Sequence, residues 1–176
     1  QKHGGVSLSK DRFGIENSAY VFDGQDDYMN SSSAVPALAN QEHTVSAWIR
    51  STRKPGVYED SGIAGYLADR GNSGYWLRKG KSFGFMAGDI GNEYGVEWAT
   101  DSYQLFGDES WHFLVGIRKD GISTIYLDGV KQAESTDHSV EFNSSSRLYI
   151  GSDSIQNYDG HNFQGRIDEV AFFDRC

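Results

Sequence analysis

Hydrophobic and polar residues alternate most clearly over residues 111–130. One face of this alternation collects six hydrophobic side chains: Trp111, Phe113, Val115, Ile117, Ile125 and Leu127. Between the two runs, Gly121 can adopt the positive φ of a tight turn, and Asp128-Gly129 supplies a second turn directly after the second run. The pattern predicts a β-hairpin with one buried face. Because a hairpin this apolar is not stable alone in water, further strands must cover it.

The rest of the chain supplies such strands. The expected strands are 18–24, 27–30, 43–51, 62–70, 74–79, 82–88, 95–100, 147–152 and 165–174, besides the hairpin. Residues 1–17 show no strong period and are expected to be irregular, and residues 35–39 are expected to form one helical turn. No stretch keeps a helical period over 12 residues. About eleven to thirteen short strands separated by turn residues predict an all-β fold, a two-sheet antiparallel β-sandwich of jelly-roll type.

The length and net charge of the chain narrow the range of possible functions. The 176 residues suit a single domain spanning residues 1–176. With 16 basic and 25 acidic residues, the formal net charge is −9, so the surface repels phosphate backbones and no nucleic-acid partner is expected. No run of 18 apolar residues is present, and no membrane insertion is expected. No signal-like segment opens the chain, and we expect a module that forms one part of a larger multidomain protein.

Five segments follow one another in order: NSAYVFDGQDDYM, HTVSAWIR, WHFLVGIRKDGISTIYLDGVKQ, LYIGSD and FQGRIDEVAFFDR. Together they resemble the laminin-G-like, concanavalin A-like jelly-roll modules of bacterial surface proteins and polysaccharide-active enzymes, with pentraxins as more distant relatives. The resemblance covers residues 10–175. It implies the jelly-roll fold but leaves the function open, since lectins, carbohydrate-binding modules, glucanases and adhesion domains share that fold.

Catalysis is not expected. Glucanases of this architecture place two carboxylates on one strand so that both face one cleft. The nearest match is Asp168-Glu169, and adjacent residues of a regular strand point to opposite faces. Glu93 and Glu97 lack the required spacing, and no Ser-His-Asp order, zinc motif or phosphate loop is present.

Calcium is the expected cofactor, because it needs several oxygen ligands and turns rich in Asp and Gly supply them. The first candidate site joins Asp23 and the carbonyl of Gly24 or Gln25 to Asp168 on the last strand. The resemblance implies this pairing, since in similar jelly rolls a structural calcium ties the first strands to the last one. The alternative is that Asp23 only fixes a turn and Asp168 pairs with Arg166 or Arg175.

The loop 152–163 is the expected ligand site. It carries four candidate ligand-binding residues together with an aromatic ring: Asp153, Asn157, Tyr158, Asp159 and His161. Sugars stack their C–H faces on aromatic rings while their hydroxyls bind polar groups. Tyr94 and Trp98 are added as candidate aromatic contacts. In pentraxins and laminin-G domains a rim calcium near the corresponding loop contacts ligand. The alternative is an ordinary polar loop, and packing roles for Tyr94 and Trp98.

The sequence therefore predicts a non-catalytic, calcium-stabilised carbohydrate-binding module, extracellular or at the cell surface, with a glycan or polysaccharide as partner. A protein-binding adhesion or spacer domain, with a cell-surface protein as partner, is the second hypothesis, and a glycoside hydrolase or lyase domain the third. Cys176 is the only cysteine. It pairs either with a cysteine outside residues 1–176 or with none, and the first reading agrees with an extracellular parent protein.

Overall fold

The computed structural model describes residues 1–33, 42–51, 61–67, 73–79, 83–89, 92–97, 108–136, 147–152 and 162–176. At residues 67, 73–76, 78–79, 83–89 and 92–97 it describes the backbone alone. Within these ranges every regular element is a strand, and no helix is long and apolar enough to cross a membrane. The expected helical turn at 35–39 lies outside the described residues.

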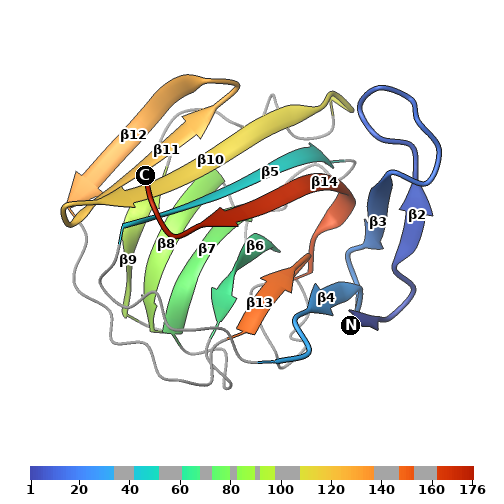
Figure 1. Cartoon of the computed structure of the whole chain (residues 1–176), viewed down its shortest axis with the longest axis horizontal. Helices are drawn as coiled ribbons and strands as arrows, with labels where there is room; N and C mark the ends of the chain where they lie inside the picture. Colours follow the sequence, from blue (N-terminus) through green and yellow to red (C-terminus); the bar gives the residue numbers. More distant parts are fainter. Residues whose placement is uncertain are drawn as a thin grey trace.

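The strands are β1 (Lys2–His3), β2 (Ser7–Ser9), β3 (Ala19–Asp23), β4 (Tyr28–Asn30), β5 (His43–Ser51), β6 (Ser61–Leu67), β7 (Ser73–Lys79), β8 (Phe83–Asp89), β9 (Asn92–Glu97), β10 (His112–Lys119), β11 (Ile122–Leu127), β12 (Val130–Thr136), β13 (Arg147–Ile150) and β14 (Gln164–Phe173). They form two sheets, with the orders β1-β4-β13-β6-β7-β8-β9 and β12-β11-β10-β5-β14-β3-β2. Figure 1 shows the second sheet in front of the first, with its central strands crossing those behind. The all-β sandwich expected from the sequence is confirmed.

The hairpin at the centre of the sequence prediction is confirmed, but its expected buried face is confirmed only on β11. Ile125 and Leu127 lie in the core, whereas the expected residues in and just before β10 are only partly buried: Trp111, Phe113, Val115 and Ile117. The register is the cause, because Leu114 and Gly116 pair directly with Leu127 and Ile125, and directly paired residues share one face of a sheet.

Lys119 pairs with Ile122 across Asp120-Gly121, and Leu127 pairs with Val130 across Asp128-Gly129. The two central residues of each turn have positive φ: 51° and 72° in the first turn, 50° and 80° in the second. Such two-residue turns match the right-handed twist of the flanking strands. The chain therefore adds β11 and β12 to β10 with the shortest possible connections.

The leader differs from its prediction. Residues 1–17 were expected to be irregular, but β1 pairs with β4 and β2 pairs with β3. These strands have only two and three residues, mostly polar, so their own sequence carries no strand period. Edge backbone groups of β3 and β4 need hydrogen-bond partners, and the leader supplies them.

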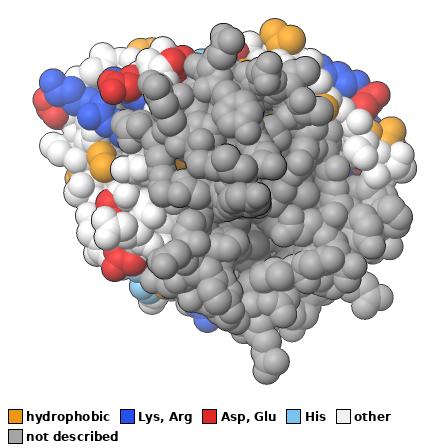
Figure 2. Space-filling view, turned by 180° about the vertical axis from the view of Figure 1, so that it is seen from behind, with side chains coloured by type: hydrophobic (Ala, Val, Ile, Leu, Met, Phe, Trp, Pro, Cys, Tyr) orange, Lys and Arg blue, Asp and Glu red, His pale blue; other side chains and the backbone are white. Residues whose placement is uncertain are grey.

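The core lies between the sheets. Inward positions of β5 alternate with outward ones, and Val45, Ala47 and Ile49 are at most 1% exposed. Phe22 on β3 and Leu114 on β10 are equally buried. On the face shown in Figure 2, described basic and acidic side chains lie beside one another at both upper corners. The described part of that face therefore mixes the two signs of charge.

Candidate functional site

Three aspartates gather in the turn that joins β3 to β4. One carboxylate oxygen from each of Asp23, Asp26 and Asp27 lies within 4.8 Å of the other two. Asp23 and Asp26 are exposed, whereas Asp27 is only 2% exposed. We call this group the acidic turn. It concentrates three like charges at the end of the sandwich where β3 meets β14.

Hydrogen bonds to two of the carboxylates shape the acidic turn. Asp27 accepts the N–H of Asp23 at 2.9 Å and also the N–H of Gly5, which binds the turn to the leader. Asp23 accepts the N–H of Gln25 at 2.8 Å, and Gly24 between them has a φ of 82°. The carboxylate of Asp26 has no hydrogen bond to any described residue. Asp26 is therefore held close to the other two carboxylates only by the path of the backbone.

The residues of the acidic turn fit calcium. Calcium takes six to eight oxygens from carboxylates, carbonyls and water, and three carboxylates offer up to six of them. Each oxygen of Asp27 already accepts one N–H but keeps a second lone pair. Among the described residues, no cation forms an ion pair with these three carboxylates. A bound calcium would supply the missing positive charge and cross-link β3, β4 and the leader. It would have no part in bond making or breaking.

The structure does not bring Asp168 to the acidic turn. Asp23 pairs with Gln164 at the start of β14, and Asp168 lies four residues further along, opposite Trp48. Four residues span about 13 Å of strand. The expected site joining Asp23 to Asp168 is therefore divided in two by the register of β14, and Asp168 belongs to a different cluster.

That second cluster is centred on Arg12 of the leader. Arg12 Nη1 lies 3.5 Å from Asp168 Oδ2 and 2.8 Å from Glu169 Oε2, and its guanidinium stacks over the Trp48 ring. The expected partners of Asp168, Arg166 and Arg175, are thus replaced by Arg12. Burial raises the pKa of Asp168 above its ordinary value, and neighbouring Glu169 raises it further, against the opposing effects of the Glu169 N–H and Arg12.

Asp168 and Glu169 also correct the expectation that adjacent strand residues face apart. A β-bulge interrupts the pairing with β5 between Asp168 and Ala171, and Glu169 has a φ of 46°. The extra residues of a bulge turn neighbouring side chains toward a common side. Both carboxylates consequently reach Arg12. Alternation therefore does not separate these two carboxylates. Both form ion pairs with Arg12.

The expected ligand loop begins and ends beside the acidic turn. Ser152 and Asn162 form an isolated antiparallel bridge, which closes the base of the loop. The Asn162 side chain is fully buried and its amide donates a hydrogen bond to the carbonyl of Gln25. The loop base and the acidic turn are therefore one structural unit at one rim of the sandwich. Five predicted ligand residues lie outside the described residues: Asp153, Asn157, Tyr158, Asp159 and His161.

The structure separates Tyr94 from that rim. Tyr94 lies on β9, at the edge of its sheet, and four strand spacings separate β9 from β13, the strand that leads into the ligand loop. At about 4.8 Å per spacing this amounts to about 19 Å. The side chain of Tyr94 and all of Trp98 lie outside the described residues. The strand that carries Tyr94 therefore lies far from β13, the strand that precedes the expected ligand loop.

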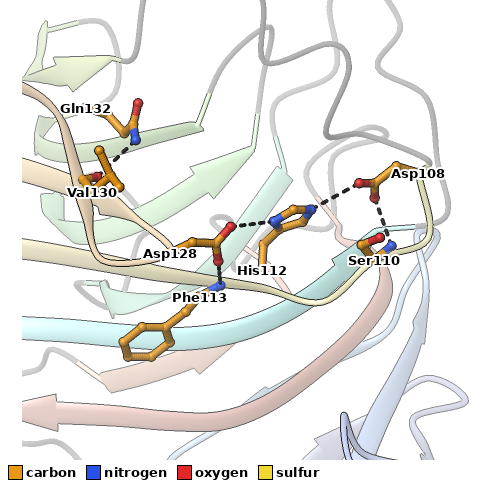
Figure 3. A network of polar contacts seen from close by, with 7 residues as sticks. All are labelled: Asp108, Ser110, His112, Phe113, Asp128, Val130 and Gln132. Carbon is orange, nitrogen blue, oxygen red and sulfur yellow. Dashed lines mark hydrogen bonds and ion pairs between the residues drawn. The ribbon is translucent and has the colours of Figure 1, made fainter.

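A histidine network occupies the start of β10 (Figure 3). Nδ1 of His112 lies 2.8 Å from Asp128 Oδ2, and Nε2 lies 3.3 Å from Asp108 Oδ2. Backbone N–H groups fix both carboxylates, since Phe113 donates to Asp128 and Ser110 donates to Asp108, each at 2.8 Å. Burial raises the pKa of Asp108, but the Ser110 N–H and His112 outweigh it, so that this pKa lies below its ordinary value. His112 had no predicted role, and it joins the loop before β10 to the β11–β12 turn.

Sequence reasoning missed Asp26 and Asp27. Their signal was present, because Asp23-Gly24-Gln25-Asp26-Asp27 places three carboxylates in five residues around a turn glycine. Such spacing is typical of oxygen-ligand loops. The prediction stopped at Asp23 because Asp27 was assigned to the next strand, whereas β4 begins at Tyr28.

Cys176 is a free thiol within residues 1–176. Its sulfur donates a hydrogen bond to the carbonyl of Arg118 at 2.9 Å. Burial and the nearby Glu42 raise the pKa of the thiol. Because the thiolate is the reactive form, this environment lowers the reactivity of Cys176 at neutral pH.

The fold and the sequence can be compared with known proteins. A search of curated protein sequences finds no match. Among solved structures, domain 4 of AbnA, a GH43 extracellular arabinanase from Geobacillus stearothermophilus, in complex with arabinotriose, is similar with a TM-score of 0.70 and 18% identity. The match covers 97% of this chain and 75% of that domain.

Two further structures share the fold. The botulinum neurotoxin serotype D/C VPI 5993 binding domain gives a TM-score of 0.71 at 16% identity, covering 99% of this chain and 43% of that one. This chain thus spans less than half of the neurotoxin domain. A native heptameric SAP-like pentraxin from Limulus polyphemus gives a TM-score of 0.63 at 10% identity, covering 89% and 75%. At these identities the likeness establishes the fold alone.

A family model identifies the sequence directly. The model described as the concanavalin A-like lectin/glucanases superfamily, of laminin-G type, matches residues 23–176. This range begins at Asp23, the last residue of β3, and holds the acidic turn, β4, the central hairpin and the final strand β14. The chain belongs to the concanavalin A-like lectin/glucanase superfamily.

Proposed function

We propose that this chain is one non-catalytic glycan-binding module, stabilised by calcium at the acidic turn and working outside the cell or at its surface. The observation that carries the proposal is the hydrogen bond from Asn162 to the Gln25 carbonyl. It couples the base of the expected ligand loop to the expected metal site. A calcium at Asp23, Asp26 and Asp27, with Gly24 allowing the turn, would hold that loop base in place.

The ligand class is proposed from chemistry and from the fold. The loop 152–163 carries carboxylates, an amide and a tyrosine, which are suited to sugar hydroxyls and to the C–H face of a pyranose or furanose ring. One structural neighbour is a domain of an extracellular arabinanase in complex with arabinotriose. That neighbour is one domain of a larger enzyme, which agrees with an accessory role for this chain in a multidomain protein.

A glycan and polysaccharide array tests the proposal. We expect saturable binding to one class of neutral glycans in calcium and at least tenfold weaker binding in chelator. The double variant Tyr158→Ala, Asp159→Ala should lose binding while keeping its thermal stability. Tyr94→Ala serves as the matched aromatic control and should bind normally. Binding that survives the double variant but is lost in Tyr94→Ala would place the ligand at the β9 edge instead.

A second candidate function is protein binding in adhesion, with a cell-surface protein as partner. The observation in its favour is that two large apolar side chains near residue 11 are exposed to solvent. Phe13 is 70% exposed and Ile15 is 58% exposed. Asp11 accepts the N–H groups of both residues at 2.8 Å, so their position is fixed before any partner arrives. A null result on the glycan array, with partner capture lost in Phe13→Ser, would favour this function.

A further inference from the structure

The two sheets pack unevenly along β13. At one end, Gly151 lies so close to the Phe22 ring that a Cβ there would be 2.4 Å from it. At the position directly before it, Ile150 on β13 and its partner Met29 on β4 are only partly buried although they pack against the core. The sheets therefore meet tightly at Gly151 and leave space between β3 of one sheet and β4 and β13 of the other.

This separation leaves an apolar crevice between the sheets. It consists of two adjoining hollows of about 360 and 300 Å³, which share Tyr20, Met29 and Ile150 as walls. Phe172 lines the first hollow and Val170 the second. Volumes of about 300 to 1,000 Å³ with mostly apolar walls are typical of small-molecule sites. Among the described residues, its walls include none of the acidic turn and neither Ser152 nor Asn162 at the base of the ligand loop.

The two hollows differ in the charged side chains that line them. Lys2 lines the first hollow, with its ammonium 4.5 Å from the centre of the Tyr20 ring. It is exposed and forms no ion pair with a described residue. Asp168 and Glu169 border the second hollow, but their carboxylates are directed to Arg12. The described charge available to a ligand in the crevice is therefore positive and lies at the Lys2 end.

We propose that the crevice binds an amphiphilic carboxylate, whose hydrocarbon tail lies against Tyr20, Met29 and Ile150 and whose head group pairs with Lys2. Burial of the tail removes apolar surface of both ligand and protein from water. The head group replaces part of the hydration of the Lys2 ammonium with a charge-assisted hydrogen bond. This site goes beyond the proposed glycan function and stands independently of it.

The chain has two methionines, which makes a direct test possible. Met29 lines the crevice, whereas Met86 lies on β8, separated from β4 by β13, β6 and β7. With methyl-labelled methionine, decanoate below its micelle concentration should shift the Met29 signal saturably and leave the Met86 signal in place. A Met29→Leu variant assigns the signals. A shift at Met86 alone, or at neither methyl group, would overturn the proposal.

Two variants separate the tail and head contributions. Ile150→Phe fills the crevice and should weaken decanoate binding at least fivefold, with an unchanged Met86 signal reporting an intact fold. Lys2→Glu should weaken decanoate at least tenfold and leave decyltrimethylammonium, which has the same tail, bound at least as well as before. Decanoate affinity within twofold of the parent in both variants would show that the crevice is not the site, even where the Met29 signal moves.

Discussion

The acidic turn and the histidine network are both built from aspartates that accept backbone N–H groups, but they differ in countercharge. In the histidine network, two carboxylates lie on opposite sides of one imidazole, at 2.8 and 3.3 Å. In the acidic turn, three carboxylates lie within 4.8 Å of one another and no described cation pairs with them. The first cluster contains a basic side chain between its carboxylates, and the second has none among the described residues.

This difference indicates which aspartates a metal would stabilise. Like charges in close proximity oppose each other's ionisation, and a cation relieves the repulsion. Calcium should therefore act on the acidic turn and have little effect on the histidine network. Each prediction below compares the two clusters in this respect, using a variant in one and a control in the other or nearby.

The largest effect is expected from Asp27→Ala. The substitution leaves the N–H groups of Gly5 and Asp23 without their acceptor in a nearly buried position. The free energy of unfolding should fall by about 2 to 4 kcal/mol in chelator. Urea unfolding measures it. The neighbouring Asp26→Ala is the control, with an expected change within about 0.5 kcal/mol because that side chain is exposed. Equal losses in the two variants would contradict the assigned role of Asp27.

Calcium itself should give the next effect. At a concentration one hundred times the dissociation constant, binding stabilises the folded state by about 2.7 kcal/mol. In a chain of this size that raises the Tm by about 5 to 11 °C. Asp26→Asn should lose at least half of this increment without changing the stability in chelator. Asp128→Asn, in the histidine network, should keep the full increment.

Thermal unfolding with and without calcium measures these increments for all three proteins. The comparison is informative because both variants remove one negative charge. A general effect of net charge would reduce both increments alike. If Asp26→Asn and Asp128→Asn respond to calcium equally, the acidic turn is not the metal site.

The histidine network should instead appear in the pH dependence of stability. The pKa of Asp108 is lowered in the folded protein, so its contribution is present above the unfolded pKa of about 3.9 and is lost as the pH falls through the folded value. Asp108→Asn should cost about 0.5 to 1 kcal/mol at neutral pH, discounted for solvent exposure. The difference from the parent should shrink below about pH 4. Urea unfolding in chelator across this range checks it, and a constant difference would contradict it.

Local signals made the fold predictable. The extended runs of β10 and β11 and the Asp-Gly pairs at both turns depend on neighbouring residues only, and the structure confirms them. The buried face of β10 was predicted wrongly, because Leu114 faces the core while Phe113 and Val115, which are also apolar, face the other side. The leader was not predictable in this way, because β1 and β2 form by pairing with strands whose edges are exposed elsewhere in the fold. A strand of two residues has too few positions to show a period.

The candidate site depended on register, which sequence alone did not supply. Asp23 was predicted as a metal ligand together with Asp168, but the carboxylates that lie near it are those of Asp26 and Asp27. The pairing of Asp23 with Gln164 decides this, and a bulge at Glu169 then turns Asp168 toward Arg12. A non-glycine residue with positive φ inside a strand leaves no trace in an alternation pattern.

The smallest change in calcium stabilisation is expected at Asp168. It distinguishes a metal site formed by the acidic turn from one that joins Asp23 to Asp168. Asp168→Asn should leave the calcium increment unchanged within about 0.3 kcal/mol, because substitutions at sites about 13 Å apart without shared partners contribute additively. The free energy of unfolding of Asp168→Asn in chelator will change for another reason, because Arg12 loses one of its two carboxylate partners. The increment therefore has to be measured within each variant, from paired melts in calcium and chelator. If Asp168→Asn loses the calcium increment, Asp168 belongs to the metal site. In that case β14 must pair with β3 in another register when calcium is bound, because Gln164 now lies opposite Asp23.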